Sequence, residues 1–303
     1  MKKMVVTGGA GFIGSNLAEG LLQEGYEVHI IDTLVNGKRE NVPAGAMLHE
    51  VDILDTSAVT EVAKGADALF HLAALPRVSY SVEHPIESNR VNVDGTVSVL
   101  TASKDAEVRK IVYSASGSAY GNQDQLPFRE NMKANPVNPY GLQKYIGELY
   151  MKLFSETYGL KTVSLRYFNI YGPHMDPSGP YGLAIAKFLE LRKMKAPLTI
   201  VGDGTQTRDF THVKDAVRAN ILAATSSNIG AGEVINIGTG RNVTVNYLAD
   251  LIDPDGIREF VSPRMEAHDA QADISKAREL LGWKPEISLE DGIAALKREW
   301  EIS

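Results

Sequence analysis

The first two dozen residues place the tightest constraint on the fold. The apolar run Met4–Val6 predicts a buried strand, Ser15–Leu22 predicts a helix, and three glycines lie between them. Gly8 allows a tight turn out of the strand, Gly11 lets the backbone approach a pyrophosphate, and Gly14 lets the helix pack against the strand. The helix N-terminus then directs free N–H groups and partial positive charge at phosphates. We therefore expect a dinucleotide to bind here.

An acidic residue after the second predicted strand supports the same interpretation. Glu27–Ile31 predicts that strand, and Asp32 follows it. In a dinucleotide-binding unit an acid at this distance from the glycines meets the ribose hydroxyls. Its carboxylate would repel a 2′-phosphate, which favours NAD over NADP. An ordinary turn with a solvated Asp is the alternative, but the order of strand, glycines, helix, strand and acid favours the dinucleotide site.

Strands alternate with helical segments over the first half of the chain. Further strands are predicted at Met47–Val51, Ala68–Leu72, Lys110–Ser114 and Lys161–Arg166. This alternation predicts an α/β fold with a doubly wound parallel sheet. Beyond about residue 172, prolines and glycines form a loop and shorter elements follow. We expect a first domain over 1–172 and a smaller C-terminal α/β substrate domain over 173–303, the two being free to interleave.

Composition excludes several classes of function. The 303 residues carry a net charge of −7, which argues against nonspecific binding to nucleic acid or anionic membranes. The chain has no cysteine, and its seven histidines show no paired ligand spacing, so we expect no disulfide and no metal site. No signal peptide and no apolar run of membrane-spanning length is evident. We expect a soluble cytoplasmic protein whose anionic ligands meet a few placed cations.

One predicted helix carries a pair of residues suited to proton transfer. Pro139 suits a helix start, and Tyr140 and Lys144 then lie one turn apart on the same face. We expect the opposite face to be the buried one, since it gathers the apolar residues Leu142, Ile146, Leu149 and Leu153.

The chemistry of this pair depends on its surroundings. A phenol has a pKa near 10, but an ammonium and an oxidised nicotinamide both favour the phenolate. Tyr140 is therefore a candidate general base, with Lys144 as its electrostatic partner. Ser116, just after the strand Lys110–Ser114, is placed to bridge substrate and phenol. Tyr and Lys are common on helices, so the pair alone is a weak signal. It indicates catalysis because it follows a serine-ended strand in a dinucleotide-binding sheet.

These features together resemble a known family. The chain is similar over nearly its whole length to the extended short-chain dehydrogenase/reductases and, within them, to the UDP-glucose (UDP-galactose) 4-epimerases. The matching segments are TGGAGFIG (7–14), HLAA (71–74), Asn92 in NVDGT, YG (120–121), NPYGLQK (138–144), RYFNIYGP (166–173), GDGTQTRDF (202–210) and ADISKARELLGW (272–283).

The resemblance implies a Rossmann fold with bound NAD and a set of site residues. The implied catalytic residues, which also contact the cofactor, are Ser116, Tyr140 and Lys144. The implied cofactor residues are Gly8, Gly11, Phe12, Ile13, Gly14, Asp32, Asn36, Gly37, Asp52, Ile53, Leu72, Ala73, Ala74, Asn92 and Phe168. The substrate would contact Ser116 and Tyr140, and its diphosphate would meet Asn169, Arg208 and Arg264.

The implied activity is that of an isomerase, the NAD-dependent 4-epimerisation of a UDP-hexose in galactose and nucleotide-sugar metabolism. Tyr140 would take the proton of the sugar 4-hydroxyl, and the C4 hydride would pass to NAD. The transient 4-keto sugar would turn over, and the hydride would return to its other face. NAD would stay bound. The resemblance also implies a homodimer, formed through the Tyr140 helix and the helix around Val91–Ala102.

Departures from the family pattern leave alternatives open. Gly117 and Ser118 replace the acidic residues of related dehydratases, so we do not expect dehydration. Residues 251–263 are shortened, and residues 265–267 replace a usual Gly–acid pair. The family's contact with the substrate ribose is therefore not carried over to this chain. The small Ala270 suggests a UDP-N-acetylhexosamine or UDP-glucuronate as alternative substrate. A non-catalytic dinucleotide-sensing module is a further alternative, although such modules lose the Tyr/Lys pair.

Overall fold

A seven-stranded parallel sheet forms the centre of the larger part of the protein. The computed structural model describes residues 1–177, 184–262 and 267–302. The strands lie in the order β11 (Ala231–Ile237), β6 (Thr162–Tyr167), β5 (Ile111–Ser116), β4 (Ala66–His71), β1 (Lys3–Thr7), β2 (Glu27–Ile31) and β3 (Met47–His49). Every neighbouring pair is parallel. The predicted α/β fold with a doubly wound parallel sheet is confirmed.

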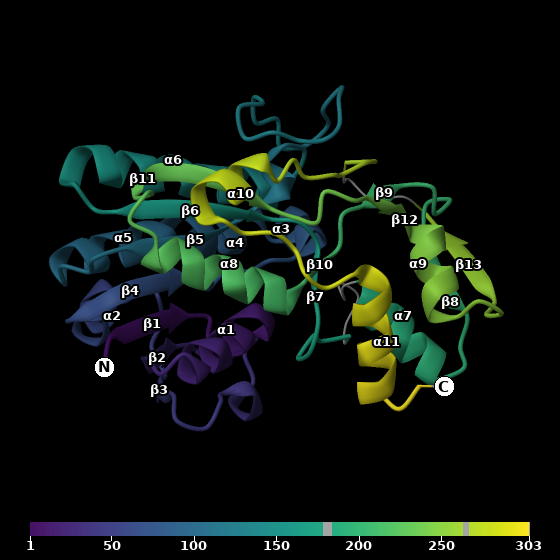
Figure 1. The fold of residues 1–303 in the computed structure, drawn as a ribbon, viewed down its shortest axis with the longest axis horizontal. Helices are drawn as coiled ribbons and strands as arrows, with labels where there is room; N and C mark the ends of the chain where they lie inside the picture. Colours follow the sequence, from purple (N-terminus) through teal and green to yellow (C-terminus); the bar gives the residue numbers. More distant parts are fainter. Residues whose placement is uncertain (178–183, 263–266, 303) are drawn as a thin grey trace.

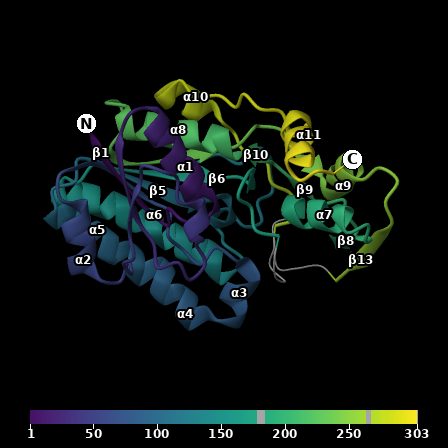
Figure 2. The ribbon, with the colours of Figure 1, turned by 90° about the horizontal axis from the view of Figure 1, so that it is seen from below.

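Helices cover both faces of this sheet (Figure 2). One face carries α1 (Phe12–Gln23), α8 (Val213–Thr225) and α10 (Ser275–Leu281). The other carries α2 (Thr56–Ala63), α5 (Gly95–Asp105) and α6 (Pro139–Tyr158), with α3 (Val78–Glu83), α4 (Pro85–Asn89) and the π-helical turn η2 (Arg90–Asp94) beside them. Because helices cover both faces, the central strands are enclosed on both sides, and β5 and β6 are buried at every residue.

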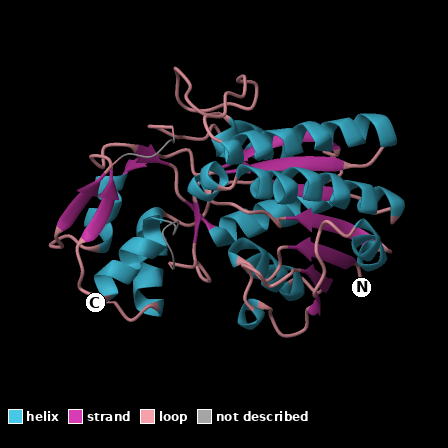
Figure 3. Ribbon diagram, turned by 180° about the vertical axis from the view of Figure 1, so that it is seen from behind, coloured by secondary structure: helices cyan, strands magenta, loops and turns pink. Residues whose placement is uncertain are grey.

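A smaller unit lies beyond the carboxyl ends of the strands (Figures 1 and 3). It contains α7 (Ala184–Lys193), α9 (Val245–Ile252) and α11 (Leu289–Glu299), with the parallel pair β8 (Leu198–Val201) and β13 (Arg258–Val261). These elements share their own apolar core, which includes Phe188, Leu248 and Ile293. Two short pairs join the units: β7 (Ile170–Tyr171) with β10 (Thr211–His212), and β9 (Thr207–Arg208) with β12 (Val243–Thr244). The short helices η1 (Arg39–Asn41) and η3 (Gly117–Ala119) complete the described elements.

The chain passes between the two units more than once. After β7 it enters the smaller unit, and it returns to the sheet through α8 and β11. It then visits α9 and β13, returns as α10 against α8, and ends with α11 in the smaller unit. Segments of the C-terminal half therefore reach the carboxyl edge of the sheet, where ligands bind in open α/β folds.

Helix α6 begins and ends for clear local reasons, but it buries an unexpected face. Asn138 Oδ1 accepts the amide of Gly141 at 2.8 Å, Pro139 occupies the first turn, and Gly159 ends the helix at φ +69°. The expectation that its leucines are buried is wrong, because the exposed fractions of Leu142, Leu149 and Leu153 are 47%, 50% and 49%. The buried residues are instead Gly141, Gln143, Lys144, Gly147, Glu148, Met151 and Phe154.

Glycine explains why this polar face can lie against the sheet. A Cβ at Gly147 would stand 2.3 Å from the hydroxyl oxygen of Tyr113 on β5, so only glycine permits this approach. Among the described residues, no helix is both long and apolar enough to cross a bilayer, and no cluster of three metal-binding side chains occurs.

Candidate active site

The glycine loop joins β1 to α1 at the carboxyl edge of the sheet. Gly8 has φ +72°, and a Cβ there would lie 2.7 Å from the amide nitrogen of Ala73. A Cβ at Gly14 would lie 2.1 Å from the carbonyl oxygen of Gly8. Gly11 is the N-cap residue of α1, and no side chain caps the helix. A Cβ at Gly11 would meet only the Gly8 oxygen, at 3.3 Å. The first amides of α1 are thus open to a phosphate, as a dinucleotide site requires.

Asp32 follows β2 and is buried against the glycine loop. Its carboxylate accepts the amides of Ala10 at 3.0 Å and Leu34 at 2.9 Å. A Cβ at Gly37 would lie 2.7 Å from Asp32 Oδ1, so the backbone of that residue lies directly over the carboxylate. The structure brings Asp32, Gly37 and the glycine loop together, which fits a ribose held beside a pyrophosphate.

A buried histidine connects the glycine loop with the loop after β4. His71 Nδ1 lies 2.8 Å from Thr7 Oγ1, and His71 Nε2 lies 3.0 Å from Thr96 Oγ1. Thr96 donates its hydroxyl hydrogen to the carbonyl of Asn92, so Thr96 can only accept from His71. Thr7 accepts the amide of Ala73, so its own hydroxyl hydrogen can be donated to His71. His71 must then accept at Nδ1 and donate from Nε2 as a neutral ring. Burial lowers the pKa of His71 to about 3, which agrees with this assignment.

Asn92 lies in the π-helical turn and fastens the loop that carries the predicted nicotinamide contacts. Its Oδ1 accepts the amide of Leu75 at 2.7 Å, and its Nδ2 donates to the Leu75 carbonyl and to Gln143 of α6. Gln143 in turn donates to Ser88 Oγ at 2.9 Å. Asn92 therefore ties the loop over Leu72–Leu75 to the helix that carries Tyr140.

Ser116 and Tyr140 meet at the carboxyl end of β5. Ser116 Oγ accepts the amide of Ser118 at 3.1 Å, and its hydroxyl group is the polar neighbour that acts on the Tyr140 phenol. Burial raises the pKa of Tyr140 to about 12, and the hydrogen bond with Ser116 opposes this rise. The backbone amide of Tyr140 donates to Ser81 Oγ of α3 at 3.1 Å. No sequence pattern indicates this contact, which holds the start of α6 in place.

Lys144 lies one turn further along α6 and is buried. Its Nζ donates to the carbonyl of Ser114 at 2.7 Å and lies 4.9 Å from the ring centroid of Tyr113. Burial lowers the pKa of Lys144 to about 7, while the charge of Glu148 raises it. The structure thus brings Ser116, Tyr140 and Lys144 to one place.

The remaining predicted cofactor residues surround the same edge of the sheet. Phe168 is buried with its ring against Gly117, and Ile53 is buried against Gly95 of α5. Phe12 and Ile13 are half-buried at the start of α1, and Leu72, Ala73 and Ala74 are half-buried after β4. The residues Asn36 and Asp52 are exposed in the loops after β2 and β3.

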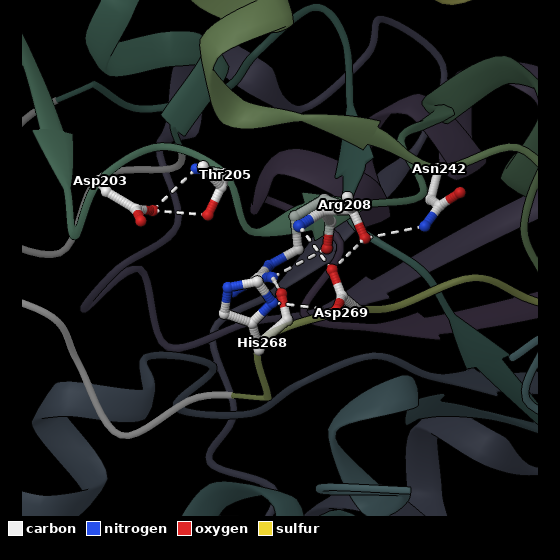
Figure 4. A network of polar contacts seen from close by, with 7 residues as sticks. Asp203, Thr205, Arg208, Asn242, His268 and Asp269 are labelled. Atoms are coloured by element: carbon white, nitrogen blue, oxygen red, sulfur yellow. Dashed lines mark hydrogen bonds and ion pairs between the residues drawn. The ribbon is translucent and has the colours of Figure 1, made fainter. Parts of the chain in front are cut away.

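The predicted substrate residues lie between the two units. Asn169 is exposed, has φ +34°, and donates to the carbonyl of Asp209 at 3.3 Å, so it neighbours Arg208. Arg208 Nη1 donates to the carbonyls of Thr207 and His268, each at 2.9 Å (Figure 4). Arg264 lies outside the described residues.

A polar network fixes the strand that carries Arg208 (Figure 4). Asp269 Oδ1 accepts the hydroxyl of Thr207 at 2.6 Å and its amide at 3.2 Å, and Asn242 donates to the same hydroxyl at 2.8 Å. His268 Nδ1 lies 2.9 Å from Asp269 Oδ2. Ala270 continues this segment, and its amide donates to the Thr207 carbonyl at 3.2 Å. The segment around Ala270 therefore forms backbone hydrogen bonds with β9.

The fold and the glycine loop define a dinucleotide-dependent enzyme with a Rossmann sheet, and Ser116, Tyr140 and Lys144 lie together at the carboxyl edge of that sheet. Residues 4–238 match the model of the NAD dependent epimerase/dehydratase family. The chain belongs to this family, whose cofactor is NAD.

Similar proteins extend over the whole chain. It is 36% identical over 304 residues to a UDP-glucose 4-epimerase of Mycolicibacterium smegmatis, with 96% of each chain covered. The UDP-glucose 4-epimerase of Thermotoga maritima, solved with UDP-glucose, is 38% identical with a TM-score of 0.93, covering 99% of this chain and 98% of that one. A UDP-N-acetylglucosamine 4-epimerase of Methanobrevibacter ruminantium, solved with UDP-N-acetylmuramic acid, is 35% identical with a TM-score of 0.91, covering 98% and 99%.

Proposed function

We propose that this protein is an isomerase that interconverts UDP-glucose and UDP-galactose by NAD-dependent epimerisation at C4. The observation that carries this proposal is the convergence of Ser116, at the end of β5, with Tyr140 and Lys144, which lie one turn apart at the start of α6. This arrangement can remove and return a hydroxyl proton. The acidic residues that a dehydratase needs beside it are replaced by Gly117 and Ser118.

Ser116, Tyr140 and Lys144 have separate roles in the proposed reaction. Ser116 would bridge the sugar 4-hydroxyl and the phenol, and Tyr140 would take the hydroxyl proton and later return it. Bound NAD would supply a reversible hydride acceptor for C4 of the sugar and a positive charge near the phenol. Lys144 contributes a second positive charge, which favours the phenolate despite burial.

The cofactor residues follow from the geometry of the glycine loop. We assign the pyrophosphate to the first amides of α1, with Gly8, Gly11, Phe12, Ile13 and Gly14 forming the cradle. Asp32, with Asn36 and Gly37, would hold the adenosine ribose, and Asp52 and Ile53 would flank the adenine. We assign the nicotinamide half to Leu72, Ala73, Ala74, Asn92, Ser116, Tyr140, Lys144 and Phe168.

The substrate side is assigned to the boundary between the units. Residues 1–172 would bind NAD and 173–303 the sugar nucleotide, with α8, β11 and α10 interleaved into the first unit. Asn169, Arg208 and Arg264 would hold the diphosphate, for which Arg208 supplies positive charge. The small Ala270 supports a second candidate, a UDP-N-acetylhexosamine or UDP-glucuronate 4-epimerase, since a small side chain leaves room for a larger sugar substituent.

We further propose a homodimer and a cytoplasmic location. The half-exposed leucines at 142, 149 and 153 on α6, next to α5, form an apolar stripe that a second copy would cover. Light scattering with size exclusion tests this association, and Leu149→Glu should weaken it. Fractionation of the source cells tests the location.

The activity is tested by incubating the purified protein with UDP-galactose and measuring UDP-glucose without added NAD. We expect conversion to the equilibrium mixture. An absence of product from protein that contains NAD would refute the proposed function. Values of kcat/KM for UDP-glucose, UDP-N-acetylglucosamine and UDP-glucuronate then separate the two candidates, because a strong preference for the plain hexose would eliminate the second.

A further inference from the structure

A buried ion pair lies one helical turn behind Lys144. Glu148 belongs to α6 and Arg166 to β6, and their side chains are 2% and 4% exposed. Arg166 Nε and Nη2 donate to the two carboxylate oxygens at 2.8 and 2.6 Å. The guanidinium carbon lies 4.4 Å from the ring centroid of Tyr120. The proposed reaction uses neither charge, so the pair needs its own explanation.

Stability alone explains the pair poorly. Removing two charges from water costs several kcal/mol for each, and well-packed apolar side chains often replace such pairs without loss. Arg166 Nη1 is buried and has no hydrogen-bond partner within the part of the chain that the structure describes. The pair is therefore costly and incompletely satisfied, which favours a role beyond packing.

The position of the carboxylate suggests that role. Glu148 follows Lys144 by four residues, so the two side chains share one face of α6, and both are buried. The charge of Glu148 raises the pKa of Lys144 against the effect of burial. Burial raises the pKa of Glu148, and the hydrogen bonds and charge of Arg166 oppose this rise. Arg166 thus keeps the carboxylate ionised, and the carboxylate in turn favours a charged Lys144.

Other groups around Lys144 do not supply the same charge. From β4 it faces His71, which is neutral because burial lowers its pKa to about 3. From β5 it faces the ring of Tyr113, whose pKa burial raises, and the Ser114 carbonyl. Tyr140 precedes it by one turn on α6. Among the described residues, Glu148 is the acidic group whose charge acts on Lys144.

We propose that Glu148 is a positioning residue for the proposed reaction. Clamped by Arg166, its carboxylate keeps the Lys144 ammonium charged and so sets the pH range over which Lys144 supports Tyr140. This inference rests on the proposed function for its catalytic consequence, but the state of Lys144 can be measured separately.

The first test compares the pH dependence of kcat/KM in matched variants. In Glu148→Gln the limb that follows the titration of Lys144 should move down by about 1 pH unit, since a neighbouring opposite charge shifts a pKa by about this amount or more. Glu148→Gln/Arg166→Gln, which leaves no unpaired charge, should show the same shift. The control Glu156→Gln removes an exposed carboxylate of α6, and Met151→Ala removes packing from its buried face. Neither control should move the limb, even where Met151→Ala lowers Tm.

The second test reads Lys144 directly. Protein labelled with [ε-¹³C]lysine is titrated by NMR in its NAD-loaded form, and Lys144→Met assigns the resonance. The Lys144 midpoint should fall by about 1 pH unit in Glu148→Gln and in the double variant, and Glu148→Asp should restore most of it. An unchanged midpoint in either charge-removing variant would overturn the proposal. If the wild-type protein converts no UDP-sugar, the proposed function fails, while this titration still decides the role of Glu148.

Discussion

Substitutions at two positions of the glycine loop should separate cofactor binding from folding. Gly11 and Gly14 lie three residues apart, yet an added methyl group meets very different surroundings at the two positions. At Gly11 only the carbonyl oxygen of Gly8 lies within 4 Å, at 3.3 Å, and the backbone is extended with φ −83°. At Gly14 the methyl carbon would lie 2.1 Å from that oxygen and 2.8 Å from the Cα of Gly9.

Gly11→Ala should fold normally and bind NAD weakly. Alanine is a poorer helix cap than glycine but stiffens the unfolded chain, and these two effects of about 1 kcal/mol or less offset each other. The methyl group would stand where the pyrophosphate approaches the helix amides. Losing one charge-assisted hydrogen bond costs about 2 kcal/mol, which corresponds to a dissociation constant about 30-fold higher.

Gly14→Ala should instead destabilise the fold. Its methyl group overlaps backbone atoms, which cannot rotate away, so the turn at Gly8 must move. Overpacking of this kind costs about 1–3 kcal/mol and should lower Tm by several °C.

Calorimetric titration of NAD into cofactor-stripped protein measures the affinity, and thermal unfolding of the same samples gives Tm. Wild-type NAD affinity in Gly11→Ala would show that the pyrophosphate is misplaced. Wild-type Tm in Gly14→Ala would show that the close approach of α1 to β1 is misjudged.

Three further predictions concern single residues. Tyr140→Phe should lower kcat by about 10²–10⁴-fold while the NAD content stays unchanged, and a smaller loss would remove Tyr140 as the base. Because folding lowers the pKa of His71 to about 3, its contribution to stability is present above pH 6.5 and is lost as the pH falls toward 3. His71→Gln should therefore reduce the pH dependence of the unfolding free energy between pH 6 and 4 by up to about 1.4 kcal/mol per unit, measured by urea unfolding, and an unchanged slope would contradict this. Asp32→Asn keeps the hydrogen-bonding shape but removes the charge, so the preference for NAD over NADP should fall about tenfold in binding titrations, and an unaltered preference would exclude charge repulsion as its source.

Local spacing explains why much of the site could be predicted. The turn at Gly8, the packing at Gly14 and the pairing of Tyr140 with Lys144 each depend on residues a few positions apart. Ser116 could be placed because it ends a predicted strand, and neighbouring parallel strands end at one edge. The alternation of apolar runs and helices was sufficient to predict the parallel sheet.

The buried face of α6 could not be predicted from apolar periodicity. Its leucines point outward, while Gln143, Lys144 and Glu148 point inward because each finds a polar partner far away in the sequence. Glu148, for example, needs Arg166 of β6, and a sequence pattern does not show that contact. The position of Glu148 four residues after Lys144 was the available signal. The insertion of β11 beside β6 likewise depends on a long-range pairing.

The most direct test of the proposed function follows the hydrogen at C4. UDP-[4-²H]glucose is incubated with the purified protein in ordinary water with no added NAD, and the UDP-galactose formed is examined by mass spectrometry and NMR. We predict that the product keeps its deuterium at C4, because the hydride leaves and returns within one active site. Product that has lost the label to solvent, or no product from NAD-containing protein, would contradict the account.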